Sequence, residues 1–454
     1  MKIVLISTYD MGRQPFGLAS PAAFLRAEGA EVTCLDLAVE PLDDARIEAA
    51  GLVAFHLPMH TATRIAARVM PRVRQINPRA HICFYGLYAP PNQRFLRSLG
   101  GETILGGEFE EALANVARRL ARGEAVPPED APRVSTGRQE FRVPERDDLP
   151  PLARYARLRL PTGDERLTGY TEASRGCRHL CRHCPVVPIY KGRFRVVPKE
   201  IVLEDIRRQV AAGAQHITFG DPDFLNGPTH AMAIASSMHT EHPGLTFDIT
   251  AKVEHLIRNE RALERLKSCG CLFITSAAES VDDRVLWLLK KGHTRADFVR
   301  AVAACRRVGL TLHPTFIPFT PWTTLRGYAE LLEMIEELDI VEEVAPVQLP
   351  LRLLIQGGSA LLDLPDVRGL AGPFDEALLV HPWRHADPLV DRLQARIEAM
   401  VRDAVDERLS RAVIFARAIA LAGGKARRVR QTRPEAPAVA ARAAVPYLTE
   451  PWFC

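Results

Sequence analysis

Two blocks of the chain alternate apolar runs of strand length with segments of helical periodicity, and this alternation limits the available folds more than any other feature. The first block spans residues 1–124 and the second spans residues 166–350. Neighbouring parallel strands need a long connection between them, usually a helix. The alternation therefore predicts parallel sheets covered by helices. We expect an α/β chain with two such units in succession.

The first block is predicted to be a doubly wound, Rossmann-like domain. Its expected strands are Lys2–Ser7, Glu31–Asp36, Leu52–His56, Ala80–Tyr85 and Glu102–Leu105, with helices at Pro15–Glu28, Thr61–Ile76, Pro91–Leu99 and Phe109–Arg122. Ligands of such folds bind beyond the carboxyl ends of the strands, where glycine allows a close backbone approach. The candidate binding residues at these ends are Thr8, Tyr9, Leu57, Gly86, Gly106, Gly107 and Glu108.

The second block is predicted to be an incomplete barrel. Its expected strands are Leu167–Ala173, His216–Gly220, Thr246–Ala251, Leu272–Ser276, Thr311–Ile317 and Glu343–Gln348. Because a closed barrel of this type needs eight strands, we expect a partial (β/α)6 barrel. Prolines recur through residues 125–165, which predicts an irregular linker. Helical periodicity predicts a helical C-terminal region over residues 351–433, followed by a flexible tail over residues 434–454.

Three cysteines with C-x3-C-x2-C spacing follow the first predicted barrel strand. They are Cys177, Cys181 and Cys184, with Gly176 before them and Pro185 after them. Three thiolates are one too few for a closed tetrahedral zinc or iron site. They are the right number for a [4Fe–4S] cluster that keeps one iron open. The alternative is three separate buried core cysteines, but the interleaved arginines and histidines make a poor core pattern.

This cysteine segment resembles the signature of radical S-adenosylmethionine (SAM) enzymes, and most of all the subgroup with an N-terminal cobalamin-binding domain. The resemblance implies that Cys177, Cys181 and Cys184 hold a [4Fe–4S] cluster and that the amino and carboxylate groups of SAM chelate the fourth iron. It implies that one electron cleaves SAM to methionine and a 5′-deoxyadenosyl radical. Family members often have an aromatic residue before the third cysteine. Here His183 takes its place, and it can stack or hydrogen-bond near the adenine.

The resemblance also implies SAM contacts at the ends of the second and fourth barrel strands. Gly220, Asp221 and Pro222 take the place of a glycine-rich edge with a glutamate, so Asp221 could accept a hydrogen bond from the SAM amine. The alternative is a simple turn. Glu279 and Ser280 match a Glu-Ser pair that contacts SAM or orders the site. The alternative there is that Ser280, or Asp282 after it, caps the following helix.

The end of the fifth barrel strand is expected to lie against the adenine. In the family, this segment reads the edge of the base with backbone groups, and the matching residues are Ile317 and Pro318. The aromatic residues Phe319 and Trp322 that follow could equally be ordinary core.

The first block resembles the cobalamin-binding domain of the same subgroup, so its strand-end residues are expected to face cobalamin. The Asp-x-His-x-x-Gly motif, whose histidine ligates cobalt in many cobalamin proteins, is absent, because Asp10 and Gly12 flank Met11 without a histidine. Either cobalamin binds with no protein histidine, or the domain has kept its shape and lost the cofactor. His60 follows the third strand and could face a cofactor, but a lone loop histidine is more often solvated.

The last residues resemble the tail of radical SAM proteins that carry Cys-Cys or Cys-selenocysteine followed by Ala-Glu-Pro. The matching residue is Cys454, preceded by Pro451, Trp452 and Phe453. The resemblance implies a selenoprotein whose reading frame continues past Cys454 through a UGA codon. A thiol or selenolate there would be a soft ligand or a nucleophile. The alternative is an ordinary frayed terminus.

Composition narrows the partners and the compartment. The formal net charge is only +4 at pH 7, which does not support the concentrated basic face of a nucleic-acid-binding protein. No run of roughly 18 or more apolar residues predicts a membrane helix, and the apolar start is too short for a signal peptide. We expect a cytoplasmic protein, where cysteines serve metals more often than disulfides. Its partners would be a small-molecule or peptide substrate and an electron donor such as flavodoxin or ferredoxin.

Taken together, the resemblance implies an enzyme that reductively cleaves SAM at a [4Fe–4S] cluster. Cobalamin-dependent methyl transfer to an unknown substrate is the reaction that the subgroup implies. One alternative is radical transfer of another SAM-derived group, or a rearrangement, on a soft element such as arsenic or selenium held by the tail. A second alternative is a non-catalytic Fe–S or zinc sensor with Cys454 as an additional ligand.

Overall fold

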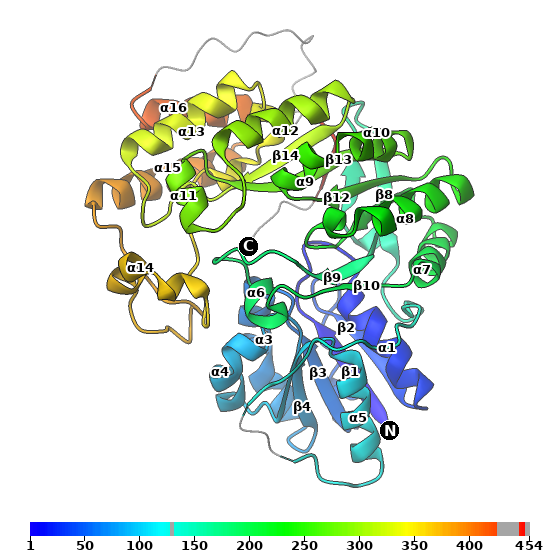
Figure 1. Ribbon diagram of the computed structural model, residues 1–454. Coiled ribbons are helices and arrows are strands. Elements are labelled where there is room, and N and C mark those ends of the chain that lie inside the picture. The colour runs from blue at the N-terminus through cyan, green and yellow to red at the C-terminus, as the bar shows by residue number, and fades with distance from the viewer. Residues whose placement is uncertain (128–130, 425–444, 450–454) are drawn as a thin grey trace.

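The computed structural model describes residues 1–127, 131–424 and 445–449. It contains two α/β units, with the hairpin that carries the cysteines between them (Figure 1). The first unit, blue in Figure 1, lies below this hairpin, and the green and yellow barrel unit lies above it. The predicted α/β class is therefore confirmed.

The first unit is one parallel sheet with strand order β2-β1-β3-β4-β5-β6. Its strands are β1 (Lys2–Ser7), β2 (Glu31–Asp36), β3 (Leu52–His56), β4 (His81–Tyr85), β5 (Thr103–Gly107) and β6 (Arg133–Ser135). Its helices are α1 (Phe16–Ala27), α2 (Asp44–Ala49), α3 (His60–Ile76), α4 (Gln93–Ser98) and α5 (Glu110–Ala121), with the 3₁₀ turn η1 (Pro90–Asn92). All five predicted strands are present, and α2 and β6 were not predicted.

Strand β1 shows why this sheet is apolar on both faces. Successive strand residues point to opposite faces. Ile3 and Leu5 belong to the core under α1 and α5, whereas Val4 and Ile6 belong to the core under α3. The strand order reverses between β1 and β3, which places the carboxyl ends of both strands at one crevice.

The second unit is a curved sheet with order β14-β13-β12-β11-β8-β7-β15. Five parallel strands form its body: β8 (Glu165–Thr171), β11 (His216–Phe219), β12 (Thr246–Thr250), β13 (Cys271–Glu279) and β14 (Thr311–Phe316). Two short antiparallel strands extend one edge, β7 (Arg157–Arg159) and β15 (Tyr447–Leu448). The helices are α7 (Lys199–Ala211), α8 (Pro228–Glu241), α9 (Val253–Arg258), α10 (Glu260–Ser268), α11 (Asp283–Leu288), α12 (Arg295–Arg307) and α13 (Leu325–Glu337), with the 3₁₀ turn η3 (Phe224–Asn226).

The sixth barrel strand was predicted in the wrong place. Glu343–Gln348 contains parts of two 3₁₀ turns, η4 (Val341–Glu343) and η5 (Pro346–Gln348). Pro346 has no N–H for a sheet ladder, which disfavours a central strand. The chain instead pairs with the residues that follow β14, at a parallel bridge between Phe319 and Arg352. The partial barrel is thus open beyond β14. The proline-rich segment over residues 125–165 was predicted to be irregular. It contributes β6, the 3₁₀ turn η2 (Leu152–Arg154) and β7.

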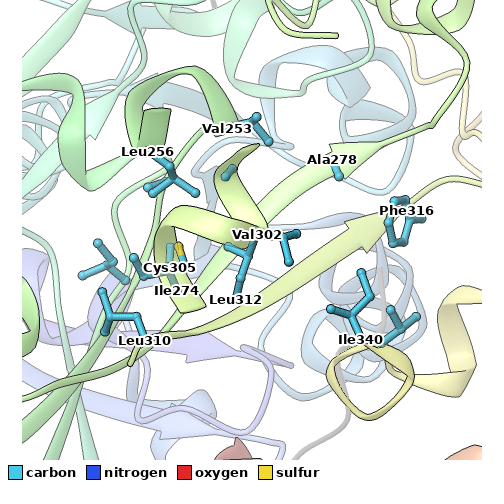
Figure 2. Close-up of a cluster of buried hydrophobic side chains, with 14 of the residues drawn as sticks. Val253, Leu256, Ile274, Ala278, Val302, Cys305, Leu310, Leu312, Phe316 and Ile340 are labelled. Carbon is cyan, nitrogen blue, oxygen red and sulfur yellow. The ribbon is translucent and has the colours of Figure 1, made fainter. Parts of the chain in front are cut away.

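The largest apolar core fills the space between the barrel strands and their helices. Figure 2 shows part of it, with Ile274 and Ala278 from β13, Leu312 and Phe316 from β14, Val302 and Cys305 from α12, and Val253 and Leu256 from α9. Burying one such aliphatic side chain fully contributes about 1.5–3 kcal/mol. Val253 and Leu256 have no exposed surface, so these two side chains anchor the short helix α9.

The remaining elements frame the barrel. A hairpin of β9 (Ser174–Gly176) and β10 (Phe194–Val196) encloses α6 (Val186–Tyr190), and none of the three was predicted. The C-terminal region contains η6 (Ala360–Asp363), α14 (Pro365–Leu370), α15 (Pro388–Asp406) and α16 (Arg411–Leu421). Helices α15 and α16 pack against the barrel core, as predicted for a helical extension. No helix in the described residues is long and apolar enough to cross a membrane.

Candidate active site

The cysteine loop leaves β9 through a turn that only glycine can make. Gly176 has a φ of +70°, and a Cβ there would lie 2.4 Å from the carbonyl oxygen of Arg193 and 2.5 Å from the ring of Tyr190. The Cys184 amide donates to the Cys181 carbonyl at 3.2 Å and closes the end of the loop. These constraints hold the cysteine segment in one compact turn.

The three thiols lie close enough to influence one another. The pKa of Cys184 is raised to about 12, mainly by burial, with smaller contributions from the neighbouring thiols of Cys181 and Cys177. Burial also raises the pKa of Cys177. Thiols in such surroundings become thiolates only when a cation binds them. The buried ammonium of Lys291 lies near Cys181 and Cys184 and offsets part of their negative charge. The donor set fits a thiolate-bound [4Fe–4S] cluster.

Asp221, predicted to receive the SAM amine, is bonded to the strand that precedes the cysteines. Its Oδ2 accepts from the Ala173 amide at 2.9 Å and its Oδ1 accepts from the Ser174 hydroxyl. Burial raises its pKa to about 7. Gly220 lies against Tyr170, because a Cβ at this glycine would overlap the tyrosine hydroxyl. Asp221 therefore positions the start of β9, and Gly220 leaves room for Tyr170 of β8. Pro222 follows them and is half-buried.

Glu279 joins the cysteine loop to the end of β13. Its Oε1 lies 3.0 Å from Nε2 of His183 and 3.2 Å from Nζ of Lys291. Burial alone would raise its pKa, but Lys291 and His183 outweigh burial and lower the pKa to about 2. Glu279 also has a φ of +64° at an irregularity in the β13–β14 pairing. Such backbone strain in a non-glycine residue concentrates at functional sites.

The residues after Glu279 begin helix α11. The Ser280 amide donates to the Ala278 carbonyl, and its hydroxyl accepts from the Asp282 amide. The Asp282 carboxylate accepts from the amides of Arg284 and Val285. The predicted helix cap is therefore confirmed for Asp282.

The segment predicted to contact the adenine forms hydrogen bonds with other residues of the protein. The Ile317 amide donates to the Glu279 carbonyl at 2.9 Å, and the Pro318 carbonyl accepts from the Thr323 hydroxyl at 2.8 Å. Phe319 is buried and stacks on Tyr328 with ring centroids 4.8 Å apart. Phe319 is thus part of the core, the alternative that its sequence left open. Trp322 packs at the edge of a smaller apolar cluster.

A second polar cluster at the barrel mouth was missed by the sequence analysis. Nδ1 of His179 lies 3.0 Å from Oε1 of Glu254, and Nδ1 of His255 lies 2.8 Å from Oδ2 of Asp223. Lys252 Nζ lies 3.5 Å from the same Glu254 oxygen. Asp223 and Glu254 follow the ends of β11 and β12 closely, so the strand-end rule could have found them.

The strand-end residues of the first sheet meet the cysteine hairpin and the C-terminal region. The Thr8 hydroxyl donates to the Ala62 carbonyl at 2.8 Å. Gly86 and Gly107 have φ values of +111° and +71°. A Cβ at Gly107 would lie only 1.9 Å from the Ser135 carbonyl oxygen, which explains the glycine by packing alone. The other predicted cobalamin residues at this edge are Tyr9, half-buried, Leu57, buried, Gly106, buried, and Glu108, buried.

Glu108 binds the hairpin directly. Its carboxylate accepts from Arg175 Nη1 at 3.1 Å and from the Tyr190 hydroxyl at 3.1 Å. His60 is not a solvated loop residue, because it begins α3 and its Nε2 lies 2.6 Å from the Leu378 carbonyl. The carboxyl edge of the first sheet therefore faces both the cysteine hairpin and the C-terminal region. Cys454 lies outside the described residues.

Comparison with known proteins places this site in a family. Residues 171–349 match the model of the radical SAM superfamily. An uncharacterized methyltransferase of Pyrococcus horikoshii is 27% identical over 194 residues, which are 42% of this chain and 40% of that protein. The hopanoid C-3 methylase of Methylococcus capsulatus is 24% identical over 333 residues, 68% of this chain and 62% of that protein. The matches thus span less than two thirds of these relatives.

Two solved structures share the arrangement of both units. The cobalamin-dependent S-adenosylmethionine radical enzyme OxsB has a TM-score of 0.70 at 15% identity, covering 87% of this chain and 66% of that chain. The radical S-adenosylmethionine methyltransferase TsrM from Kitasatospora setae has a TM-score of 0.59 at 18% identity, covering 75% and 72%. Such low identities establish a shared fold. The family match, together with the cysteine loop, identifies residues 171–349 as a radical SAM domain.

Proposed function

We propose that this enzyme cleaves SAM reductively at a [4Fe–4S] cluster held by Cys177, Cys181 and Cys184, and that it transfers a methyl group with the help of cobalamin. The observation that carries the first part is the loop itself. It brings three thiols to the mouth of a parallel half-barrel, beside the buried ammonium of Lys291. Barrel enzymes bind and react at this end of their strands.

The surrounding residues have separate tasks in this proposal. Gly176 and Asp221 hold the loop in its turn. Glu279 orients His183 and Lys291 from the end of β13. When bound, the cluster supplies the electron that breaks a carbon–sulfur bond of SAM, and cobalamin supplies a carrier for the methyl group. The role of the protein itself is to bind SAM, to keep Lys291 charged beside the thiolates and to fix the distance between the two units.

The proposal that cobalamin binds is supported less directly than the proposal of SAM cleavage. Its support is that the likeness to OxsB, a cobalamin-dependent enzyme, extends over both units of this chain. The carboxyl edge of the first sheet also faces the cysteine hairpin through Glu108 and Tyr190. That edge offers Thr8, Tyr9, Leu57, Gly86, Gly106, Gly107 and Glu108. The residues after β1 include no histidine, so cobalt would have no histidine ligand from that turn.

The electron donor in this proposal is a small acidic redox protein such as flavodoxin or ferredoxin. Residues 173–199, which contain the cysteine loop, include no aspartate or glutamate. Arg178, Lys191 and Arg193 are exposed there, around the half-exposed Leu180. A basic surface beside the cluster loop steers an acidic partner by charge complementarity. The substrate, a small molecule or a peptide, is not specified by these residues.

The proposed function is tested with anaerobically reconstituted protein. Dithionite and SAM should yield 5′-deoxyadenosine, and the Cys184→Ala variant should yield none. A purified sample incubated with hydroxocobalamin and desalted should retain the cobalamin absorbance. Iron–sulfur absorbance without any cleavage of SAM would contradict the first part, whereas cleavage without retained cobalamin would contradict only the second. In that case transfer of another SAM-derived group becomes the leading reaction.

A further inference from the structure

The polar cluster around His179 has the composition and the spacing of a metal site. One ligand atom each from His179, Glu254 and His255 lies within 4.8 Å of the other two. One atom each from Cys177, His179 and Asp223 meets the same limit. Ligands at about 2.1 Å from one ion, arranged tetrahedrally, lie about 3.4 Å from one another. Nδ1 of His179 and Oε1 of Glu254 lie 3.0 Å apart, close to that value.

These atoms are close together without satisfying one another. Within the described residues, Oδ2 of Asp223, Nδ1 of His255 and Nε2 of His179 are buried and make no hydrogen bond, although two of them are only 2.8 Å apart. The Asp223 side chain has no exposed surface, and its other oxygen accepts from the Leu225 amide. A buried carboxylate oxygen that accepts no hydrogen bond is unfavourable. An ion on the other ring nitrogen of His255 would leave the proton on Nδ1, where it can be donated to Asp223.

The scaffold holds the ligands rigidly. Val253 and Leu256 of α9 point into the core in Figure 2 and have no exposed surface. Residues three apart share one helix face, so Glu254 and His255 between them are left on the side toward the cysteine loop. Gly292 packs against this glutamate, because a Cβ there would lie 2.6 Å from Oε2. Preorganised ligands of this kind favour a bound ion.

We propose that His179, Glu254 and His255 hold one divalent transition-metal ion, separate from the cluster of the three cysteines, while Asp223 orients His255 through Nδ1 of that imidazole. Two imidazoles with carboxylates suit Zn²⁺ or Fe²⁺. The ammonium of Lys252 balances one of the two carboxylates, and the second negative charge remains for the ion. The ion would sit beside Cys177, between the cluster loop and the ends of β11 and β12. It could there bind a donor atom of the substrate.

The test separates this ion from the iron–sulfur cluster in the full-length chain. Anaerobically reconstituted protein is passed over a chelating resin, and its iron, sulfide and zinc are measured per chain. The same protein, loaded with Co²⁺ instead of zinc, is examined by absorption spectroscopy. We expect about one metal equivalent per chain in addition to the cluster iron. We also expect the Co²⁺-loaded protein to show absorption bands typical of nitrogen and oxygen ligands. The variant His255→Gln should lose this equivalent and keep the cluster, whereas Cys184→Ala should lose the cluster and keep the equivalent.

The matched control is His239→Gln, which changes a half-buried histidine on α8 outside the cluster. It should keep both metals. Three results would overturn the proposal: no metal beyond the cluster iron in the unchanged protein, equal metal content in His255→Gln and the control, or loss of the Co²⁺ bands in Cys184→Ala. His255→Gln and Glu254→Gln could instead weaken SAM binding at unchanged metal content. In that case these polar side chains bind the amine of SAM and not a metal ion.

Discussion

Arg175 and Glu110 form an ion pair in which Nη2 lies 2.7 Å from Oε1, and both side chains are more than nine-tenths buried. Glu108 and Glu172 bind the same guanidinium at 3.1 and 2.9 Å. Glu108 and Glu110 belong to the first unit, whereas Arg175 stands two residues before Cys177 on β9. The cysteine loop is therefore fastened to the first sheet by buried charge, which fixes the distance between the two units.

The first prediction removes this guanidinium. Arg175→Gln leaves three carboxylates in the interior without their cation, and breaking a buried ion pair on one side costs about 3–5 kcal/mol. We expect the free energy of unfolding to fall by this amount and the cluster content after reconstitution to fall with it. Denaturant unfolding of the full chain measures the first effect. The control is Arg307→Gln, which breaks an exposed pair with Glu260 and should cost less than about 1 kcal/mol. Equal effects of the two variants would contradict the fastening role.

The second prediction concerns the turn before Cys177. Gly176→Ala introduces a Cβ that meets the Arg193 carbonyl at 2.4 Å, in addition to the strain of a positive φ. Gly163 also has a positive φ, +92°, but nothing lies near its missing Cβ. Gly163→Ala therefore carries only the strain, about 1–2 kcal/mol. We expect Gly176→Ala to lose most of its cluster iron, measured by iron and sulfide analysis, and Gly163→Ala to retain it. Similar iron content in both would show that the loop tolerates the displacement.

The sequence was sufficient for the architecture because strand burial leaves a strong pattern. Strands β1, β3 and β4 each contain a run of four apolar residues, which the sequence shows directly. The false strand at Glu343–Gln348 contains Val344, Ala345 and Val347, which are interrupted by Pro346. The hairpin of β9 and β10 and the helix α9 are too short for periodicity to detect. They exist because tertiary contacts such as those of Val253 hold them in place.

Only part of the site could be predicted from the sequence. The three cysteines are specified by spacing along the chain, so the sequence shows them directly. Which of two nearby carboxylates faces the site depends on the turn between them. Asp221 turns back to bind Ala173, whereas Asp223 points one oxygen toward Nδ1 of His255 at the barrel mouth. The positive φ of Glu279 is likewise set by the irregular end of β13. Such choices follow from backbone geometry, which residue types alone do not determine.

The third prediction concerns Glu279. Glu279→Gln keeps the size of the side chain but removes the charge that pairs with Lys291 and His183. We expect the cluster to form, because the cysteines are unchanged, and 5′-deoxyadenosine formation to fall at least about tenfold, the equivalent of 1.4 kcal/mol in the barrier. Single-turnover assays with dithionite measure this. Glu330→Gln, which removes an exposed pair with Arg326, is the control and should be silent. Unchanged SAM cleavage in Glu279→Gln would limit this residue to a structural role.

The fourth prediction is a pH dependence of stability at the end of β1. Burial raises the pKa of Asp10 from 3.8 to about 7, Arg13 opposes the shift, and Asp36 and Glu172 add to it. Because the folded pKa is the higher one, the folded state binds the proton more tightly. The stabilisation is fully present below pH 3.8 and is lost as the pH rises through 7.

Asp10→Asn stays neutral at every pH, so its free energy of unfolding should match the unchanged protein near pH 4 and exceed it above pH 7. The difference between the two curves, measured by urea unfolding from pH 4 to 8, isolates this group from all others that titrate. Asp147→Asn, at an exposed position, should run parallel to the unchanged protein throughout. If the Asp10→Asn curve is also parallel, Asp10 is ionised in the folded state at neutral pH. The crevice beyond β1, where the cofactor is proposed to bind, would then carry an additional negative charge.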